Sequence, residues 1–143
     1  MKLLILIFPF LFSAVDEGYA QCGKNIRLTS SKTIHMDGNG NITQTEIEKS
    51  VVEINQLLIT INVRDESKTV CNIKSIECNW DIPFKNGKTL IEATLNTKDG
   101  ELKNVVLTIQ GIDGQLILLF EMEDRPDKLI KVIIDMFEEG LEE

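Results

Sequence analysis

Residues 86–122 read NGKTLIEATLNTKDGELKNVVLTIQGIDGQLILLFEM, and this stretch decides the fold class. Three Asx-Gly pairs stand in it, 13 and 14 residues apart: Asn86-Gly87, Asp99-Gly100 and Asp113-Gly114. Asx-Gly is the preferred centre of a tight hairpin turn, because both residues accept a positive φ. The spacing therefore predicts an antiparallel β-meander with strands of about ten residues.

Apolar residues alternate along the segments between these turns, as in a strand with one buried face. Upstream, Ile26, Leu28, Ile34 and Met36 share one parity, which places His35 on the opposite, solvated face. About eight strands fit an antiparallel barrel or a two-sheet sandwich, so we predict an all-β fold. The expected strands cover residues 26–36, 41–47, 50–55, 57–63, 68–78, 88–97, 101–110 and 115–123.

The C-terminal segment 126–143 fits two structures. Its apolar residues cover one arc of a helical wheel, with Pro126 near the first position and Asp124 as a cap. Residues 128–136 also alternate and contain a β-branched run, which favours a strand. We expect the strand, as a ninth one that completes the sheet, and retain the helix as the alternative.

The N-terminus has the pattern of a secretory signal peptide. Lys2 precedes an apolar stretch from Leu3 to Val15, and Gly18-Tyr19-Ala20 places small residues before a cut after Ala20. The stretch would span only about 20 Å as a helix, too short for a membrane anchor. We predict a signal peptide over 1–20 and one exported domain over 21–143, periplasmic or extracellular, with acylation of Cys22 left open.

Composition excludes several functions. The chain has 23 Asp and Glu against 15 Lys and Arg, a net charge of −8, which argues against binding to nucleic acid. His35 is the only histidine and no Gly-x-Ser-x-Gly elbow is present, so no nucleophile and base can be paired. We expect no catalytic residue, no cofactor and no enzymatic activity; the remaining alternative is an acidic hydrolase, which would need two carboxylates converging in a cleft, and no spacing in the sequence singles out such a pair. The single tryptophan, Trp80, is expected to fill the core.

The three cysteines allow at most one internal disulfide and leave one thiol over. Cys71 and Cys78 would lie more than about 20 Å apart on one straight strand, whereas a disulfide needs Cα atoms within about 7 Å. They can pair only if the chain turns back near Lys74-Ser75, where the apolar parity switches as at a turn or a bulge. A Cys71–Cys78 bridge and two buried thiols both remain open.

Residues 35–46, HMDGNGNITQTE, resemble the calcium loop of the EF-hand family. Calcium binds a shell of oxygen atoms, and the resemblance implies that they come from Asp37, Asn39, Asn41, Thr43 and Glu46. His35 stands where the family has Asp, and the preceding residues are β-formers rather than a helix. A hairpin turning over residues 37–40 is therefore favoured, and no metal is expected.

The signal, a mature chain starting at Gln21 and a meander with Asx-Gly turns together resemble small exported all-β proteins of Bacteroidetes, some of them lipocalin-like. The Gly-x-Trp signature of lipocalins is absent, since the region reads Gly23-Lys24-Asn25-Ile26. A barrel of eight strands can hold one small molecule. We expect a non-catalytic domain that binds a small apolar ligand, or alternatively a protein–protein interaction domain of the envelope.

Overall fold

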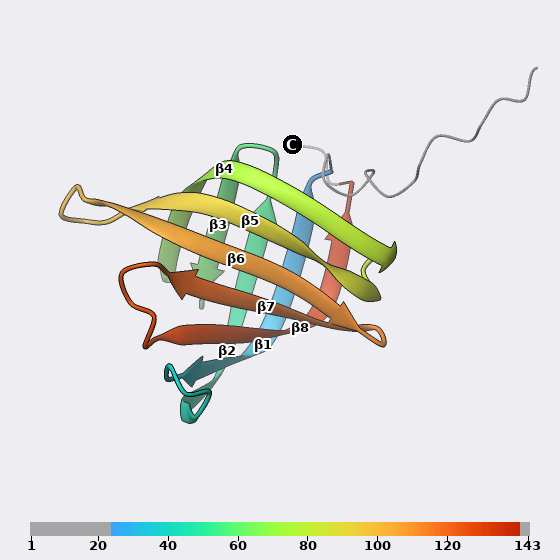
Figure 1. Cartoon of the computed structure of the whole chain (residues 1–143), viewed down its shortest axis with the longest axis horizontal. Coiled ribbons are helices and arrows are strands. Elements are labelled where there is room, and N and C mark those ends of the chain that lie inside the picture. The colour runs from blue at the N-terminus through green and yellow to red at the C-terminus, as the bar shows by residue number, and fades with distance from the viewer. Residues whose placement is uncertain (1–23, 141–143) are drawn as a thin grey trace, which may run out of the picture.

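The computed structural model describes residues 24–140, which form a closed antiparallel β-barrel of eight strands (Figure 1). Each strand pairs with the next, and β8 pairs with β1 to close the barrel. The meander is confirmed, with a barrel rather than a sandwich. The strands are β1 Ile26–Met36, β2 Ile42–Ile54, β3 Leu58–Val63, β4 Ser67–Ile82, β5 Asn86–Asn96, β6 Leu102–Ile112, β7 Gln115–Met122 and β8 Leu129–Glu139.

The strand count differs from the expected one at β2. The expected strands 41–47 and 50–55 form one strand of 13 residues, because β2 continues through a shift in its register against β1. At the other end of the chain, β8 confirms the expected strand over 128–136 and replaces the helical alternative. The strand at residues 128–136 is therefore the eighth, and it closes the barrel.

Asx-Gly turns join some of the strands as predicted. Asp113 and Gly114 both have positive φ, 51° and 86°, and form the two-residue turn between β6 and β7. The prediction for Asn86-Gly87 is wrong, because β5 begins at Asn86 and the turn lies over residues 83–85. Asn86 instead accepts a hydrogen bond at Oδ1 from the Asp113 backbone N–H, at 2.9 Å, which ties two turns together.

Bulges decide which residues face the barrel interior. Along β1, Leu28 and Ser30 face inward, and an irregularity between Ser30 and Lys32 then shifts the parity by one residue. His35 consequently lines an interior cavity, and Ile34 is buried outside the core cluster. The expectation of a solvated His35 opposite a core-facing Ile34 is therefore wrong, since period-2 reading assumes an unbroken strand.

β4 contains the second informative bulge, between Ile73 and Ser75. The predicted switch of parity at Lys74-Ser75 is confirmed as a bulge within one continuous strand. Cys71 and Cys78 therefore lie seven positions apart on the same strand, and the chain does not turn back between them.

Aromatic side chains fill one end of the barrel. Trp80 is 8 % exposed, and its indole N–H donates a hydrogen bond to Thr89 Oγ1 at 2.8 Å. Phe84 packs beside Trp80 with ring centroids 5.1 Å apart, and it stacks on Phe137 at 3.9 Å. Trp80 therefore fills the core as predicted, and this end is closed.

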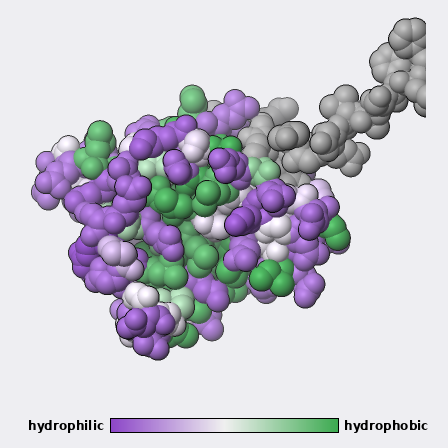
Figure 2. Space-filling view, viewed as in Figure 1, coloured by the Kyte–Doolittle hydropathy of each residue, from purple (hydrophilic) through white to green (hydrophobic). Residues whose placement is uncertain are grey.

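The outer surface mixes polar and apolar residues. Figure 2 shows apolar side chains gathered over the middle of one barrel face, with hydrophilic residues around them. No helix in residues 24–140 is long and apolar enough to cross a membrane. The expected signal peptide and Cys22 lie outside the described residues.

Candidate ligand-binding cavity

The end of the barrel opposite Trp80 contains a cavity of about 290 Å³. Residues from seven of the eight strands line it, and most of them are apolar. The volume is close to the lower end of the range for small-molecule sites, about 300 Å³. The apolar lining consists of Val52, Ile61, Val63, Leu95, Leu118, Phe120, Ile130 and Val132.

Polar groups are concentrated on one wall, formed by β1 and β2. Glu46, Glu48 and Ser50 are two residues apart on β2, so their side chains all point into the barrel. Thr33 and His35 continue this wall on β1, where Thr33 pairs with Glu46. Below Ser50 the same face of β2 becomes apolar at Val52. The cavity thus has one polar wall, and its other walls are apolar apart from Thr69 on β4.

Glu48 is the most buried charge of this wall, with a side chain only 8 % exposed. Its carboxylate Oε2 lies 2.9 Å from Nη2 of Arg64, which stands in the β3–β4 turn and is 55 % exposed. Burial raises the pKa of Glu48, and the hydrogen bond and negative charge of Glu46 add to the rise, while Arg64 and His35 oppose it. Glu46 and Glu48 therefore form a hydrogen-bonded carboxyl pair.

Glu46 is held from two sides. Gln44 donates from Nε2 to its Oε1 at 2.7 Å, and His35 Nε2 lies 3.7 Å from its Oε2. These contacts fix one carboxylate oxygen toward the neighbouring glutamine and the other toward His35. The carboxyl group is consequently positioned on the cavity wall rather than free to turn into solvent.

Ser50 is the unusual member of the wall. It is 4 % exposed, and its hydroxyl Oγ has no hydrogen-bond partner in residues 24–140. Ser30, directly paired with it on β1 and 2 % exposed, is satisfied, since its Oγ donates to Lys32 O at 3.0 Å and accepts from Lys32 N at 3.1 Å. A buried hydroxyl without a partner costs about 1–3 kcal/mol, so such groups mark positions where a ligand can bind.

The residues of the calcium-like loop form a hairpin turn between β1 and β2. Asp37 Oδ1 accepts the backbone N–H groups of Asn39 and Asn41, both at 2.9 Å, and these bonds lower the Asp37 pKa. Thr43 donates from Oγ1 to the His35 carbonyl at 3.2 Å. Asp37 is therefore engaged in shaping the turn.

Glu46, the last of the five residues in the calcium-loop resemblance, does not reach this turn. It pairs with Thr33, four residues before Asp37, which places it about 13 Å away along the strands. Within residues 24–140, no group of three His, Cys, Asp or Glu side chains is arranged to hold a metal ion. The structure thus places Glu46 apart from Asp37, Asn39 and Asn41, which lie together in the turn.

The two cysteines of β4, Cys71 and Cys78, differ in whether they form a disulfide. Cys71 is a free thiol, fully buried, and burial raises its pKa to about 11. Cys78 is disulfide-bonded. The Cys71–Cys78 bridge is therefore not formed, because both residues belong to one extended strand.

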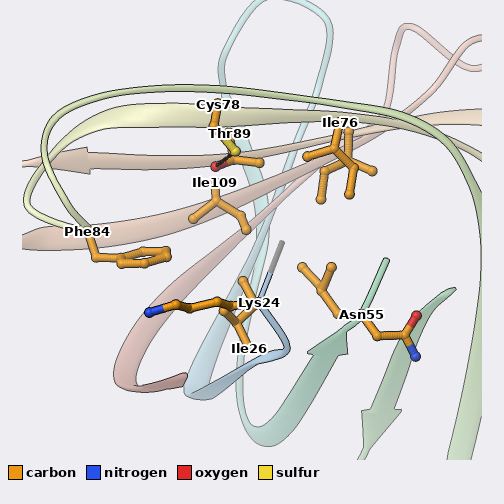
Figure 3. A pocket seen from close by; sticks show the side chains of 10 residues that line it. Lys24, Ile26, Asn55, Ile76, Cys78, Phe84, Thr89 and Ile109 are labelled. Atoms are coloured by element: carbon orange, nitrogen blue, oxygen red, sulfur yellow. Dashed lines mark hydrogen bonds between the residues drawn. The ribbon is translucent and has the colours of Figure 1, made fainter. Parts of the chain in front are cut away.

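Cys78 lines a second pocket, of about 20 Å³, at the closed end (Figure 3). Figure 3 shows Thr89 beside Cys78, joined by a hydrogen bond of 3.5 Å, with Phe84 and Lys24 across the space. A space of this size holds about one water molecule. It is too small for a ligand, whereas the cavity of about 290 Å³ is lined by residues that face the barrel interior and approaches the volume of a small-molecule site.

Sequence reasoning identified Glu46 for another role and missed Glu48, Ser50 and Thr33. The signal was present in the period-2 order of Glu46, Glu48, Ser50 and Val52. It was hidden because β2 was divided into two strands between residues 47 and 50. Comparisons with family models, curated proteins and solved structures found no match to the chain.

Proposed function

We propose that this barrel is a non-catalytic binding domain that holds one small, mostly apolar molecule in the open-end cavity. The observation that supports it is a cavity of about 290 Å³ with apolar walls and a few polar groups on one side. This combination is typical of small-molecule sites, in which apolar contact gives affinity and few polar groups fix orientation. The closed, aromatic end opposite makes the site a blind pocket.

A binding role is favoured over catalysis by the state of the polar groups. The two carboxyl groups are hydrogen-bonded to each other, and Arg64 and His35 flank them. Within residues 24–140, no hydroxyl or thiol is hydrogen-bonded to the imidazole ring of His35, whose Nε2 lies beside Glu46. The groups are therefore arranged to hold a ligand in place.

Decanol is a suitable neutral probe for the proposed function. We expect saturable binding by calorimetry, with NMR shift changes at the methyl groups of Leu118 and Ile130. Thr69→Phe, inside the cavity, should weaken binding at least tenfold because the ring occupies the space. Thr60→Phe, on the outer face of the same sheet region, is the matched control and should bind as the wild type. Equal binding by both variants would contradict the proposal.

We propose that the domain acts outside the cytoplasm, after cleavage at Ala20. The signal-like pattern from Lys2 to Ala20 supports this, and so does a disulfide at Cys78, since disulfides persist mainly in oxidising compartments. The intact mass of the protein isolated from its host tests the proposal. We expect a chain beginning at Gln21, and a mass that includes residues 1–20 would contradict it.

A protein-interaction role is the second candidate, and it rests on the β1–β2 hairpin. β2 pairs with β3 only from Ser50 to Ile54, so its earlier part pairs with β1 alone. Ile42 and Ile47 are 61 % and 77 % exposed there. An unpaired edge with apolar side chains can accept a strand from a partner. If this role holds, Ile47→Lys should abolish co-purification of a host protein and leave decanol binding unchanged.

A further inference from the structure

We infer that the ligand is an amphipathic amine, whose ammonium group lies against the carboxyl groups of Glu46 and Glu48 while its hydrocarbon part fills the barrel. This inference rests on the proposed binding function and adds the chemical class of the ligand. The ligand class is inferred from the wall formed by β1 and β2, which carries two carboxyl groups, several hydrogen-bond acceptors and the unpartnered hydroxyl of Ser50.

The polar wall offers acceptors and almost no cation. Glu46 and Glu48 contribute four carboxyl oxygens, and Ser50 and Thr33 contribute hydroxyls that can accept. His35 is the only basic side chain among the residues that line the cavity. A ligand with N–H donors therefore matches this wall better than one with acceptors alone.

Two cations near this end of the barrel, Arg64 and Lys103, already have partners. Arg64 is held by Glu48, and Lys103 Nζ lies 2.5 Å from Asp124 Oδ2 and 3.4 Å from Glu101 Oε2. An anionic ligand such as a fatty acid would have to displace Glu48 from Arg64 and then leave this carboxylate buried. It would also face the charge of Glu46, and like charges at short range are costly in a partly buried site.

The Ser50 hydroxyl provides an independent sign of a ligand. Ser50 is only 4 % exposed and lines the cavity. Its hydroxyl has no hydrogen-bond partner in residues 24–140. An ammonium group has three N–H donors, and Ser50 lies one step deeper on β2 than Glu48. One donor can reach this hydroxyl while the others serve the carboxyl pair, which satisfies the buried oxygen.

The carboxyl groups of Glu46 and Glu48 together favour the binding of a cation. Two carboxyl groups in contact disfavour full ionisation, and the raised Glu48 pKa reflects this. A bound ammonium would stabilise both in the ionised form, as an opposite charge within a few ångström does. The apolar residues that face β2 across the cavity, among them Leu118 and Phe120, would then cover the hydrocarbon chain.

Three probes with the same hydrocarbon chain separate the possibilities: decylammonium, decanol and decanoate. Calorimetric titration of the full-length chain at pH 7 should give decylammonium at least tenfold tighter than decanol, and decanoate weaker than decanol. Glu46→Gln and Glu48→Gln should each reduce the preference for decylammonium over decanol about tenfold, because each removes one of the two carboxyl groups that the ammonium group contacts. Glu53→Gln, an exposed carboxylate on the outer face of β2, is the matched control and should change neither.

The outcomes also separate the inference from the proposed function. If decanol binds but decylammonium binds no tighter, the amine inference fails and the binding function stands. If decanoate binds tightest, the site takes anions and the inference is overturned. If none of the three probes binds, both fail. Should Glu48→Gln not fold, Glu46→Gln, at a side chain 29 % exposed, provides the same comparison.

Discussion

Ser50 and Glu48 are neighbours on the inner face of β2, yet Arg64 lies 2.9 Å from the Glu48 carboxylate and the Ser50 hydroxyl has no partner in residues 24–140. Ser50→Ala should therefore stabilise the unliganded protein by about 1 kcal/mol, because it removes a buried hydroxyl that makes no hydrogen bond. Urea denaturation of wild type and variant measures the difference.

Ser30→Ala is the control for this prediction. Ser30 is buried to the same degree but makes two hydrogen bonds with Lys32, so its loss should destabilise by about 1 kcal/mol. The two serines are directly paired across β1 and β2, and their substitutions should act in opposite directions. Equal destabilisation by both would mean that Ser50 Oγ has a partner in solution.

Glu48 should make the stability depend on pH in an unusual direction. Its folded pKa is raised above the ordinary value of 4.5, mainly by burial, so the folded state binds this proton more tightly than the unfolded chain. The contribution of Glu48 to stability is therefore complete below pH 4.5 and falls as the pH rises through the raised pKa. Most paired carboxyl groups show the reverse.

Urea denaturation between pH 4.5 and 7.5 tests this. Glu48→Gln should remove most of the decline in unfolding free energy across that range, because glutamine does not titrate. Glu46→Gln should reduce it in part, since it takes away the neighbouring charge that helps to raise the Glu48 pKa. A wild-type profile that rises across this range, or an unchanged slope in Glu48→Gln, would show that Glu48 is ionised throughout.

The fold was predictable to the extent that alternation and turn chemistry are local. Asp113-Gly114 forms its turn where expected, and the strand at residues 128–136 closes the barrel. The bulge at Ile73/Ser75 was visible as a change of parity, because apolar residues stand on both sides of it. At these three places the apolar and turn residues of the local sequence are sufficient to predict the structure.

The cavity lining was not predictable because it depends on a bulge in β1 that leaves no mark in the sequence pattern. The irregularity after Ser30 lies in a polar stretch, where period-2 reading has no apolar residues to follow. The sequence pattern consequently places His35 on the wrong face. Glu48 falls between the two expected strands 41–47 and 50–55, and Ser50 begins the second of them, so the inward-facing row that both belong to is divided. Their inward position appears only when β1 and β2 are paired.

Two glycines near Trp80 are expected to be intolerant of substitution. A Cβ on Gly111 would lie 2.8 Å from Trp80 Cζ3 and 3.0 Å from the Lys85 carbonyl oxygen. Gly111→Ala should destabilise by about 2 kcal/mol, as overpacking in a filled core does, and shift the near-ultraviolet circular dichroism of Trp80. Gly87 has a φ of 141° and a Cβ there would meet the Trp80 backbone at 2.5 Å, so Gly87→Ala should be worse.

Gly38→Ala provides the comparison. Gly38 does not have a positive φ, and its nearest neighbour, Pro126 O, would lie at an ordinary 3.4 Å from the new methyl group. Its unfolding midpoint should stay within error of the wild type. If Gly111→Ala were tolerated equally, the closed end would have room that the packing of Trp80 does not show.

Asp37 is expected to stabilise the β1–β2 turn without calcium. Asp37→Ala should lower the unfolding temperature, because the backbone N–H groups of Asn39 and Asn41 lose their acceptor. Asp37→Asn keeps an Oδ1 acceptor and should lose less. Calcium chloride should leave the unfolding temperature of the wild type unchanged, and a calcium-dependent rise that disappears in Asp37→Ala would restore the EF-hand interpretation.

The three cysteines should behave differently toward alkylation. Cys71 is buried, and its pKa of about 11 keeps it in the thiol form, so iodoacetamide should not label it in the folded protein. Labelling should occur in urea without a reductant. Cys78 is disulfide-bonded and should react only after reduction. Non-reducing peptide mapping should recover Cys71 in an unlinked peptide and Cys78 in a linked one.

Cys71→Ala and Cys71→Ser complete this prediction, because they separate packing from redox chemistry. Cys71 behaves as a small apolar residue in the core, so alanine should cost little beyond the lost sulfur contacts. Serine adds a buried hydroxyl and should cost about 1–3 kcal/mol more. Reduction of the disulfide should destabilise wild type and Cys71→Ala equally. A peptide that links Cys71 to another cysteine, or labelling of Cys71 in the folded protein, would contradict its place in the barrel core.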